Sequence, residues 1–169
     1  RVLKTAKRVR NETEISRGRV SVGSVAVELA EKVFDDLAAK TVMVVGAGEV
    51  NEQTLKHLVE KGVREALVLN RSMERGRALA DRHGGTAVAF DRLEEYLPRA
   101  DIVVSSTSAP HFVIHAAAVR HAILARHQRP MFLIDLAVPR DIEPAVGELN
   151  NVYLYDIDDL QKLTDENLA

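Results

Sequence analysis

A strand-to-helix turn built on two glycines constrains the fold of this chain more than any other feature. The residues at 41–45 (Thr-Val-Met-Val-Val) predict a buried strand, and Gly46 and Gly48 follow it. Gly46 permits a tight turn, and the absence of a side chain at Gly48 lets the backbone approach a bound group closely. A helix is predicted from Glu49, and a second apolar strand follows at 65–69. This order predicts a βαβ unit of the kind that binds dinucleotides.

The residues after the second strand indicate which dinucleotide fits. An NAD-binding unit usually has an acidic residue there to hold the ribose 2′-hydroxyl, but this chain has Asn70, Arg71 and Ser72. A guanidinium and a hydroxyl suit a 2′-phosphate, and Arg75 lies one helical turn further on. The sequence therefore predicts NADP(H) rather than NAD(H). Two plainer interpretations stay open: Arg71 forms only a surface ion pair with Glu74 or another neighbour, or the glycines serve a turn that binds no nucleotide.

One position departs from the usual glycine pattern. Asn51 occupies the third glycine position, where the helix normally packs closely on the first strand. Its side chain either widens the turn or projects toward the phosphates and adds a hydrogen bond.

Apolar strands and amphipathic helices alternate along the rest of the chain. We expect strands at 41–45, 65–69, 86–90, 101–104 and 131–135, with a further extended piece at 152–155. We expect helices at 2–9, from the cap Ser21 through Leu37, and at 49–61, 72–83, 93–96, 116–126 and 156–169. Continuously apolar strands indicate a parallel sheet covered on both faces. The predicted fold class is α/β, a Rossmann-like doubly wound parallel sheet with flanking N-terminal and C-terminal helices.

The composition limits the chemistry that the chain can perform. The chain has 23 Lys and Arg against 25 Asp and Glu, and this net charge of −2 does not indicate a basic surface for binding nucleic acid. No apolar run is long enough to span a bilayer, so we expect a cytoplasmic protein without membrane contact. The lack of cysteine excludes thiol catalysis and thiolate metal sites within the chain. His111 and His115 have no ligand companions at metal-site spacing, so we predict neither a catalytic residue nor a metal site.

Several sequence blocks together resemble one known family. They include Val-Gly-Ala-Gly-Glu at 45–49, Asn-Arg-Ser at 70–72, Val-Pro-Arg-Asp-Ile at 138–142 and Asn-Val-Tyr-Leu-Tyr-Asp-Ile-Asp-Asp-Leu at 151–160, with further matches at 20–30, 105–107 and 109–111. These blocks resemble the central domain of glutamyl-tRNA reductases, and the resemblance covers essentially the whole chain. The last two blocks are the most diagnostic, because nucleotide binding in general does not require them.

The resemblance implies an activity and a domain organisation. Members of this family use NADPH to reduce the glutamyl ester of glutamyl-tRNA to glutamate-1-semialdehyde, the first step toward tetrapyrroles. They combine an N-terminal catalytic domain carrying a nucleophilic cysteine, a central NADPH-binding domain and a C-terminal dimerisation domain. By this resemblance, residues 1–20 are the end of a linker helix and loop, 21–155 bind NADP(H), and 156–169 begin the helix toward the dimerisation domain. We therefore expect a part of a longer homodimeric enzyme that is inactive alone.

The resemblance also implies roles for individual residues around the cofactor. The pyrophosphate would be held by the backbone of Gly46, Ala47, Gly48, Glu49 and Val50, with Asn51 beside them. The 2′-phosphate would be surrounded by Asn70, Arg71, Ser72 and Arg75. The nicotinamide ribose would border Ser106, Thr107 and Ser108 after Ser105, and the nicotinamide ring would pack near Ala137 and Val138. Ser108, like Asn51, replaces a glycine that is usual in the family.

Two other functions remain as alternatives. In the first, Asn51 and Ser108 abolish cofactor binding and leave a degenerate Rossmann scaffold that joins neighbouring domains. In the second, the chain is the NADP-binding domain of a dehydrogenase of the shikimate dehydrogenase type, which also has an Asn-Arg-Ser/Thr run, although the blocks at 139–142 and 153–160 argue against this. The run Pro139-Arg140-Asp141 is predicted either to face the catalytic domain or to form a turn held by an internal Arg–Asp pair.

Overall fold

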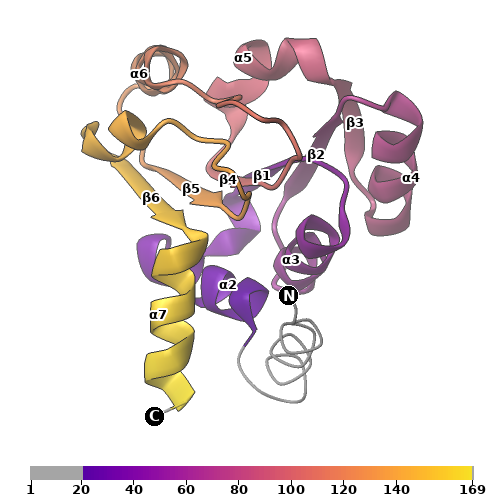
Figure 1. Ribbon diagram of the computed structural model, residues 1–169. Helices are drawn as coiled ribbons and strands as arrows, with labels where there is room; N and C mark the ends of the chain where they lie inside the picture. The colour runs from indigo at the N-terminus through magenta and orange to yellow at the C-terminus, as the bar shows by residue number, and fades with distance from the viewer. Residues whose placement is uncertain (1–20, 169) are drawn as a thin grey trace.

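The computed structural model describes residues 21–168, and its centre is a six-stranded parallel sheet (Figure 1). The strands are β1 (Thr41–Val45), β2 (Glu65–Asn70), β3 (Thr86–Ala89), β4 (Ile102–Ser105), β5 (Met131–Asp135) and β6 (Val152–Asp156). Their order across the sheet is β3-β2-β1-β4-β5-β6, and every neighbouring pair is parallel. This is the order of a doubly wound Rossmann sheet, so the predicted fold class is confirmed. The helix and loop expected within residues 1–20 lie outside the described residues.

Helices cover both faces of this sheet. One face carries α2 (Val22–Val33), α3 (Glu49–Glu60), α4 (Met73–His83) and α7 (Ile157–Leu168). The other carries α5 (Leu93–Tyr96), α6 (Ala116–Ala125) and the 3₁₀ turns η3 (Leu97–Arg99) and η4 (Pro144–Glu148). Side chains alternate along each strand, so that Val42 and Val44 enter one core while Met43 and Val45 enter the other. Two cores built this way explain why the strands are apolar at every position.

The first described helix is shorter than predicted. Ser21 caps α2 as expected, because its Oγ accepts a hydrogen bond of 3.1 Å from the Ser24 N–H. The helix ends at Val33, since Phe34 has extended backbone angles. Leu37 therefore lies in a separate 3₁₀ turn, η1 (Leu37–Ala39), where its side chain is still buried. The apolar spacing predicted burial correctly but not the break in the helix.

The C-terminal segment belongs to the same fold unit. The extended piece predicted at 152–155 pairs with β5 as the sixth strand, and α7 follows it directly. Figure 1 shows α7 lying beside α2 on one side of the sheet. Leu160 of α7 is fully buried in the core that α2 also enters. Among residues 21–168, no helix has the length and apolarity that a membrane span requires.

A charge cluster joins α3 to α4. The Glu52 carboxylate accepts hydrogen bonds from Arg82 Nε at 2.7 Å and Arg82 Nη2 at 3.0 Å, and it lies 3.0 Å from His83 Nε2. These hydrogen bonds, from Arg82 first and His83 second, lower the pKa of Glu52 from 4.5 to about 2. The carboxylate therefore stabilises the folded state when it is ionised.

Replacing Glu52 by glutamine is expected to lower the free energy of unfolding by about 1 kcal/mol at pH 7, because the cluster is partly exposed to solvent. A carboxyl with a depressed pKa contributes fully above its unfolded value, so the difference from wild type should shrink as the pH falls from 4.5 toward 2. Urea unfolding of both proteins across this range measures it. Glu28→Gln, at an exposed position of α2, is the control and should show no such trend. A difference for Glu52→Gln that does not change with pH would contradict the assignment.

Candidate nucleotide-binding site

A pocket of about 710 Å³ opens at the carboxyl ends of the central strands. Val45, Leu69, Ser105 and Asp135 occupy matching positions in the register of β1, β2, β4 and β5, so the loops that follow meet at one edge. The strand order reverses between β1 and β4, where open α/β sheets bind their ligands. Most of the predicted site residues line this pocket: Gly46, Ala47, Gly48, Asn70, Arg71, Ser72, Arg75, Ser106, Thr107, Ser108, Ala137 and Val138.

The glycine turn forms the middle of the pocket. Gly46 has a φ of +105°, and a Cβ at this position would collide with the carbonyl oxygen of Ser106. Gly48 is the N-cap of α3, so no side chain accepts a hydrogen bond from the first backbone N–H groups of this helix. A Cβ added at Gly48 would have no atom within 4 Å. The first turn of α3 therefore presents backbone N–H groups beside open space, an arrangement that suits an anion.

Asn51 points into the protein rather than toward the pocket. Its side chain is fully buried, and its Nδ2 donates hydrogen bonds to the carbonyl oxygens of Val45 at 2.8 Å and Gly46 at 3.0 Å. Its Oδ1 is buried without a hydrogen-bond partner in the described part of the chain. The interpretation in which Asn51 projects toward the phosphates is wrong, because its amide fastens the turn from the inside. Glu49 and Val50 are exposed in the first turn of α3 but do not line the pocket.

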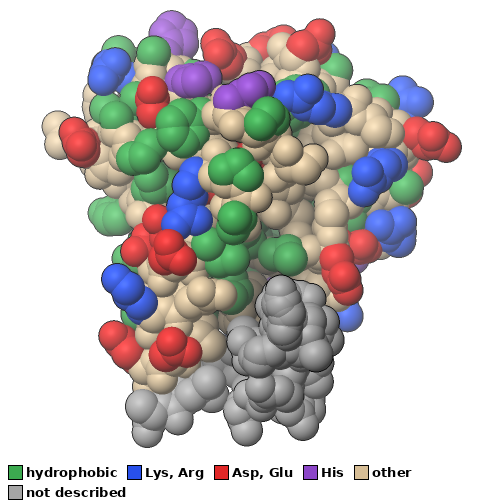
Figure 2. Space-filling model, viewed as in Figure 1, with side chains coloured by type: hydrophobic (Ala, Val, Ile, Leu, Met, Phe, Trp, Pro, Cys, Tyr) green, Lys and Arg blue, Asp and Glu red, His purple; other side chains and the backbone are tan. Residues whose placement is uncertain are grey.

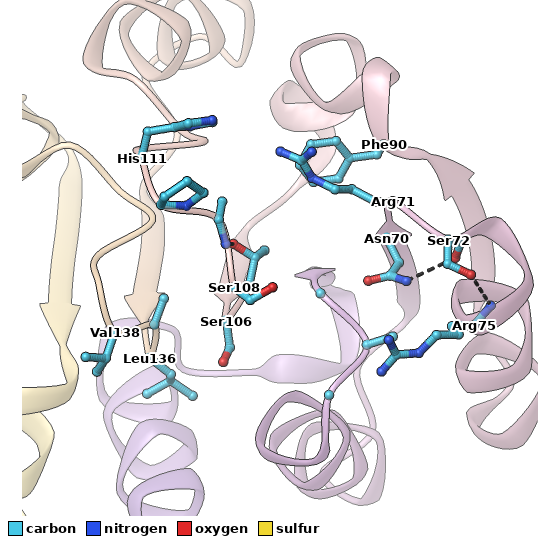
Figure 3. A pocket seen from close by; sticks show the side chains of 17 residues that line it. Asn70, Arg71, Ser72, Arg75, Phe90, Ser106, Ser108, His111, Leu136 and Val138 are labelled. Carbon is cyan, nitrogen blue, oxygen red and sulfur yellow. Dashed lines mark hydrogen bonds between the residues drawn. The ribbon is translucent and has the colours of Figure 1, made fainter.

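Basic and aromatic side chains gather where β2 and β3 end (Figure 3). The Arg71 guanidinium carbon lies 5.2 Å from the centroid of the Phe90 ring. Among residues 21–168, Arg71 forms no ion pair with Glu74 or with another neighbour. Ser72 caps α4 through a hydrogen bond of 3.2 Å from the Arg75 N–H to its Oγ. Phe90 was not among the predicted site residues. The parallel pairing of β2 with β3 places it beside Arg71, and sequence alone does not fix that register.

The opposite side of the pocket is formed by the loops after β4 and β5. Figure 3 shows Ser106 and Ser108 from one loop, and Leu136 and Val138 from the other. Val138 is 76% exposed at the pocket edge and precedes a cis peptide bond to Pro139. Leu136, Ala109, Pro110 and His111 also line the pocket and were not predicted to do so.

Two buried carboxylates lie beneath these loops. Asp135 accepts hydrogen bonds from the backbone N–H groups of Ala137 at 3.1 Å, Asp141 at 3.0 Å and Ile142 at 2.8 Å. Burial raises the pKa of Asp135, although these hydrogen bonds act in the opposite direction. Asp141 is also fully buried. The pair of acidic side chains thus belongs to the support of the pocket and not to its surface.

Arg140 faces away from its neighbour in the sequence. Its Nη2 lies 2.6 Å from Asp158 Oδ2 and 3.4 Å from Asp156 Oδ2, so it fastens the loop to the start of α7. The predicted internal pair between Arg140 and Asp141 is wrong, because the Asp141 carboxylate is used inside the protein.

The histidines and surface charges show no further site. His111 Nδ1 lies 3.1 Å from the carbonyl oxygen of Phe112, and His115 is the N-cap of α6. Within residues 21–168 there is no group of three or more His, Asp or Glu side chains arranged to hold a metal. Figure 2 shows acidic and basic side chains mixed over the visible face, as expected for a net charge of −2.

Comparisons with known proteins agree with this fold. The family model described as shikimate / quinate 5-dehydrogenase matches residues 28–163. A glutamyl-tRNA reductase of Solidesulfovibrio magneticus is 52% identical over 164 residues, which are 97% of this chain but 36% of that protein. The chain therefore spans little more than a third of the length of this relative.

The solved structures that resemble this chain also include glutamyl-tRNA reductases. Glutamyl-tRNA reductase from Methanopyrus kandleri has a TM-score of 0.84 and 52% identity, covering 96% of this chain and 41% of that one. The nucleotide binding domain of glutamyl-tRNA reductase from Thermoplasma volcanium has a TM-score of 0.69 at 18% identity, and the match covers 89% of this chain and 96% of that one. Shikimate 5-dehydrogenase from Thermus thermophilus, solved with NADP(H) and shikimate, has a TM-score of 0.56 at 19% identity. The match covers 85% of this chain and 52% of that one, and it shows a likeness of fold alone. The chain belongs to the shikimate / quinate 5-dehydrogenase family, and its resemblance to the nucleotide-binding domain of glutamyl-tRNA reductases is confirmed.

Proposed function

We propose that this chain is the NADPH-binding domain of an enzyme that reduces glutamyl-tRNA to glutamate-1-semialdehyde in tetrapyrrole synthesis. The observation that carries the proposal is a single pocket that combines an open glycine turn with Arg71 and Arg75 at the end of β2. Relatives of about 50% identity that are named glutamyl-tRNA reductase support the choice of reaction.

The residues present fit the cofactor. The space at Gly48 and the uncapped start of α3 suit a pyrophosphate. The guanidinium groups of Arg71 and Arg75 are exposed beside the pocket and suit a 2′-phosphate. Asn51 leaves this space free because its amide is turned inward. This argues against the alternative of a degenerate scaffold, in which Asn51 blocks the site.

The chain's own residues would bind and orient the cofactor. When bound, NADPH supplies the hydride for the reduction. We assign the adenosine half of the pocket to Arg71, Ser72, Arg75 and Phe90, and the nicotinamide half to the loops that carry Ser106, Ser108 and Val138. The sequence contains no cysteine, so the thiol that accepts the glutamyl group would come from a catalytic domain elsewhere in the enzyme.

The rest of the organisation is also proposed from the resemblance. Residues 1–20 would connect to the catalytic domain, 21–155 would form the cofactor domain, and 156–169 would begin the connection to a dimerisation domain. The whole enzyme would be a cytoplasmic homodimer that acts on glutamyl-tRNA. The chain belongs to the family described as shikimate / quinate 5-dehydrogenase, but an enzyme that acts on shikimate is the weaker alternative. The solved shikimate dehydrogenase of Thermus thermophilus shares 19% identity with this chain, whereas the glutamyl-tRNA reductase of Solidesulfovibrio magneticus shares 52%.

Calorimetric titration with NADPH and NADH tests the cofactor assignment. Wild type should bind NADPH more tightly than NADH. Arg71→Ala should weaken NADPH binding by about tenfold or more, and should leave NADH binding nearly unchanged, because only NADPH carries the 2′-phosphate.

Arg77→Ala is the matched control for this titration, since Arg77 is exposed on α4 and does not line the pocket. Binding of neither nucleotide by wild type would favour the scaffold alternative. An equal loss of NADPH and NADH affinity in Arg71→Ala would contradict the 2′-phosphate assignment.

A further inference from the structure

The buried carboxylate of Asp141 holds the loop after β4 without reaching the pocket. Its Oδ2 accepts hydrogen bonds from Ser105 Oγ at 2.7 Å and from the Thr107 N–H at 2.8 Å. Its Oδ1 accepts a third from Thr107 Oγ1 at 2.6 Å. Asp141 is fully buried and is absent from the pocket lining. All three donors come from one short segment, so a single side chain sets the path of that segment.

The backbone of Asp141 fastens two more parts of the same region. Its carbonyl oxygen accepts hydrogen bonds from the N–H groups of Val113 at 2.7 Å and Ile114 at 3.1 Å, just before α6. Its own N–H donates to Asp135 at the end of β5. Asp141 therefore joins the loop after β4, the loop after β5 and the approach to α6 at one point.

This arrangement changes the role expected for Thr107. The Thr107 hydroxyl donates its proton to Asp141, and its oxygen accepts a hydrogen bond of 3.2 Å from the Ala109 N–H. The hydroxyl is thus committed inside the protein and is not free to donate to a ribose. The side chains of this loop that remain available to a ligand are those of Ser106 and Ser108, which Figure 3 shows on the pocket side.

Other hydrogen bonds do not replace those of Asp141. The sheet fixes the loop only as far as its first residues, through the Ser106 N–H to the Val45 carbonyl at 2.9 Å and the Leu136 N–H to the Ser105 carbonyl at 2.8 Å. Beyond Ser106, the hydrogen bonds that residues 107–109 make within the described part of the chain lead to Asp141, directly or through Thr107. The shape of the loop on the nicotinamide side therefore depends on one carboxylate.

We propose that Asp141 is a positioning residue for the nicotinamide half of the cofactor, acting through Thr107 on the placement of Ser106 and Ser108. The proposal rests on the proposed function. The carboxylate is needed because it offers acceptors on both oxygens. An asparagine of the same size lacks the negative charge and has one acceptor oxygen instead of two. The hydrogen bonds from Ser105 and Thr107 would lose their charge assistance, and one hydroxyl would have to reverse its direction and accept from the N–H₂ group.

The test compares two ligands that would occupy different parts of the pocket. NADPH fills both halves of the pocket, whereas adenosine 2′,5′-bisphosphate resembles its adenosine half alone. Asp141→Asn should weaken NADPH binding by about tenfold and leave binding of adenosine 2′,5′-bisphosphate within about twofold of wild type. Thr107→Val should cause the same selective loss, and Thr107→Ser, which keeps the hydroxyl, should bind both ligands like wild type.

Each other outcome has a distinct meaning. Equal weakening of both ligands would show that Asp141 supports the fold in general, and no weakening would show that the loop does not need it; either result overturns the proposal. If circular dichroism shows that Asp141→Asn is not folded, the Thr107→Val and Thr107→Ser pair decides. Failure of wild type to bind either ligand would instead reject the proposed function, and this inference with it.

Discussion

Replacing Gly46 by alanine is expected to lower the free energy of unfolding by about 3 kcal/mol and to abolish nucleotide binding. Two costs add at this position. The φ of +105° is unfavourable for a residue with a side chain, and the new Cβ would collide with the Ser106 carbonyl oxygen. Relief requires the turn to move away from β4, which also displaces the start of α3. Urea unfolding and NADPH titration of the same variant measure the two effects.

Gly62→Ala separates these costs. Gly62 also has a positive φ, of +91°, but a Cβ there would have no atom within 4 Å. It should cost only the backbone strain, about 1 kcal/mol, and leave binding unchanged. If Gly46→Ala were no more destabilising than Gly62→Ala, the contact with Ser106 would not restrict the turn.

Arg126→Met is expected to lower the free energy of unfolding by about 3 to 5 kcal/mol. Arg126 is 1% exposed at the end of α6. It donates to four carbonyl oxygens, those of Pro98 at 3.1 Å, Ala100 at 2.8 Å, Arg129 at 3.2 Å and Pro130 at 2.7 Å. Its Nη2 also lies 2.8 Å from Asp101 Oδ1. Methionine fills part of the volume but leaves a buried carboxylate and four carbonyl groups without these donors. Thermal and urea unfolding measure the loss.

Arg129→Met is the control for this variant. Arg129 lies 3.9 Å from the same carboxylate, but its side chain is 61% exposed, so its removal should cost less than about 0.5 kcal/mol. Adding Asp101→Asn to Arg126→Met should recover part of the lost stability, because it removes the uncompensated charge. An equal effect of Arg126→Met and Arg129→Met would contradict the view that the buried pair and its carbonyl contacts carry this region.

The sequence predicted the sheet well for a physical reason. Continuously apolar strands and glycine-punctuated helices specify an α/β fold locally, and the elements from β1 through α7 lie within a few residues of the predicted ranges. The end of α2 was missed because apolar spacing continues to Leu37 across a break in the backbone. Periodicity reports which face is buried, and it does not report where a helix stops.

The placement of residues at the pocket was predictable where position along the chain decided it. Gly46 and Arg71 follow strand ends, so their places at the pocket follow from topology alone. The directions of Asn51 and Arg140 were not predictable in this way. The Asn51 amide turns inward because two carbonyl groups at the end of β1 accept from it, and Arg140 turns outward because two carboxylates lie at the start of α7. Both depend on partners that are brought together only by folding.

The junction between β6 and α7 connects the C-terminal helix directly to the sheet. β6 ends at Asp156 and α7 begins at Ile157, with no loop between them. Asp156 and Asp159 exchange hydrogen bonds of 3.0 and 2.9 Å, and Arg140 holds the same point to the loop beside Val138. To swing, the helix would have to break these contacts together. A displacement of the first turn of α7 would therefore disturb the Arg140 contacts that tie this junction to the loop at the pocket edge.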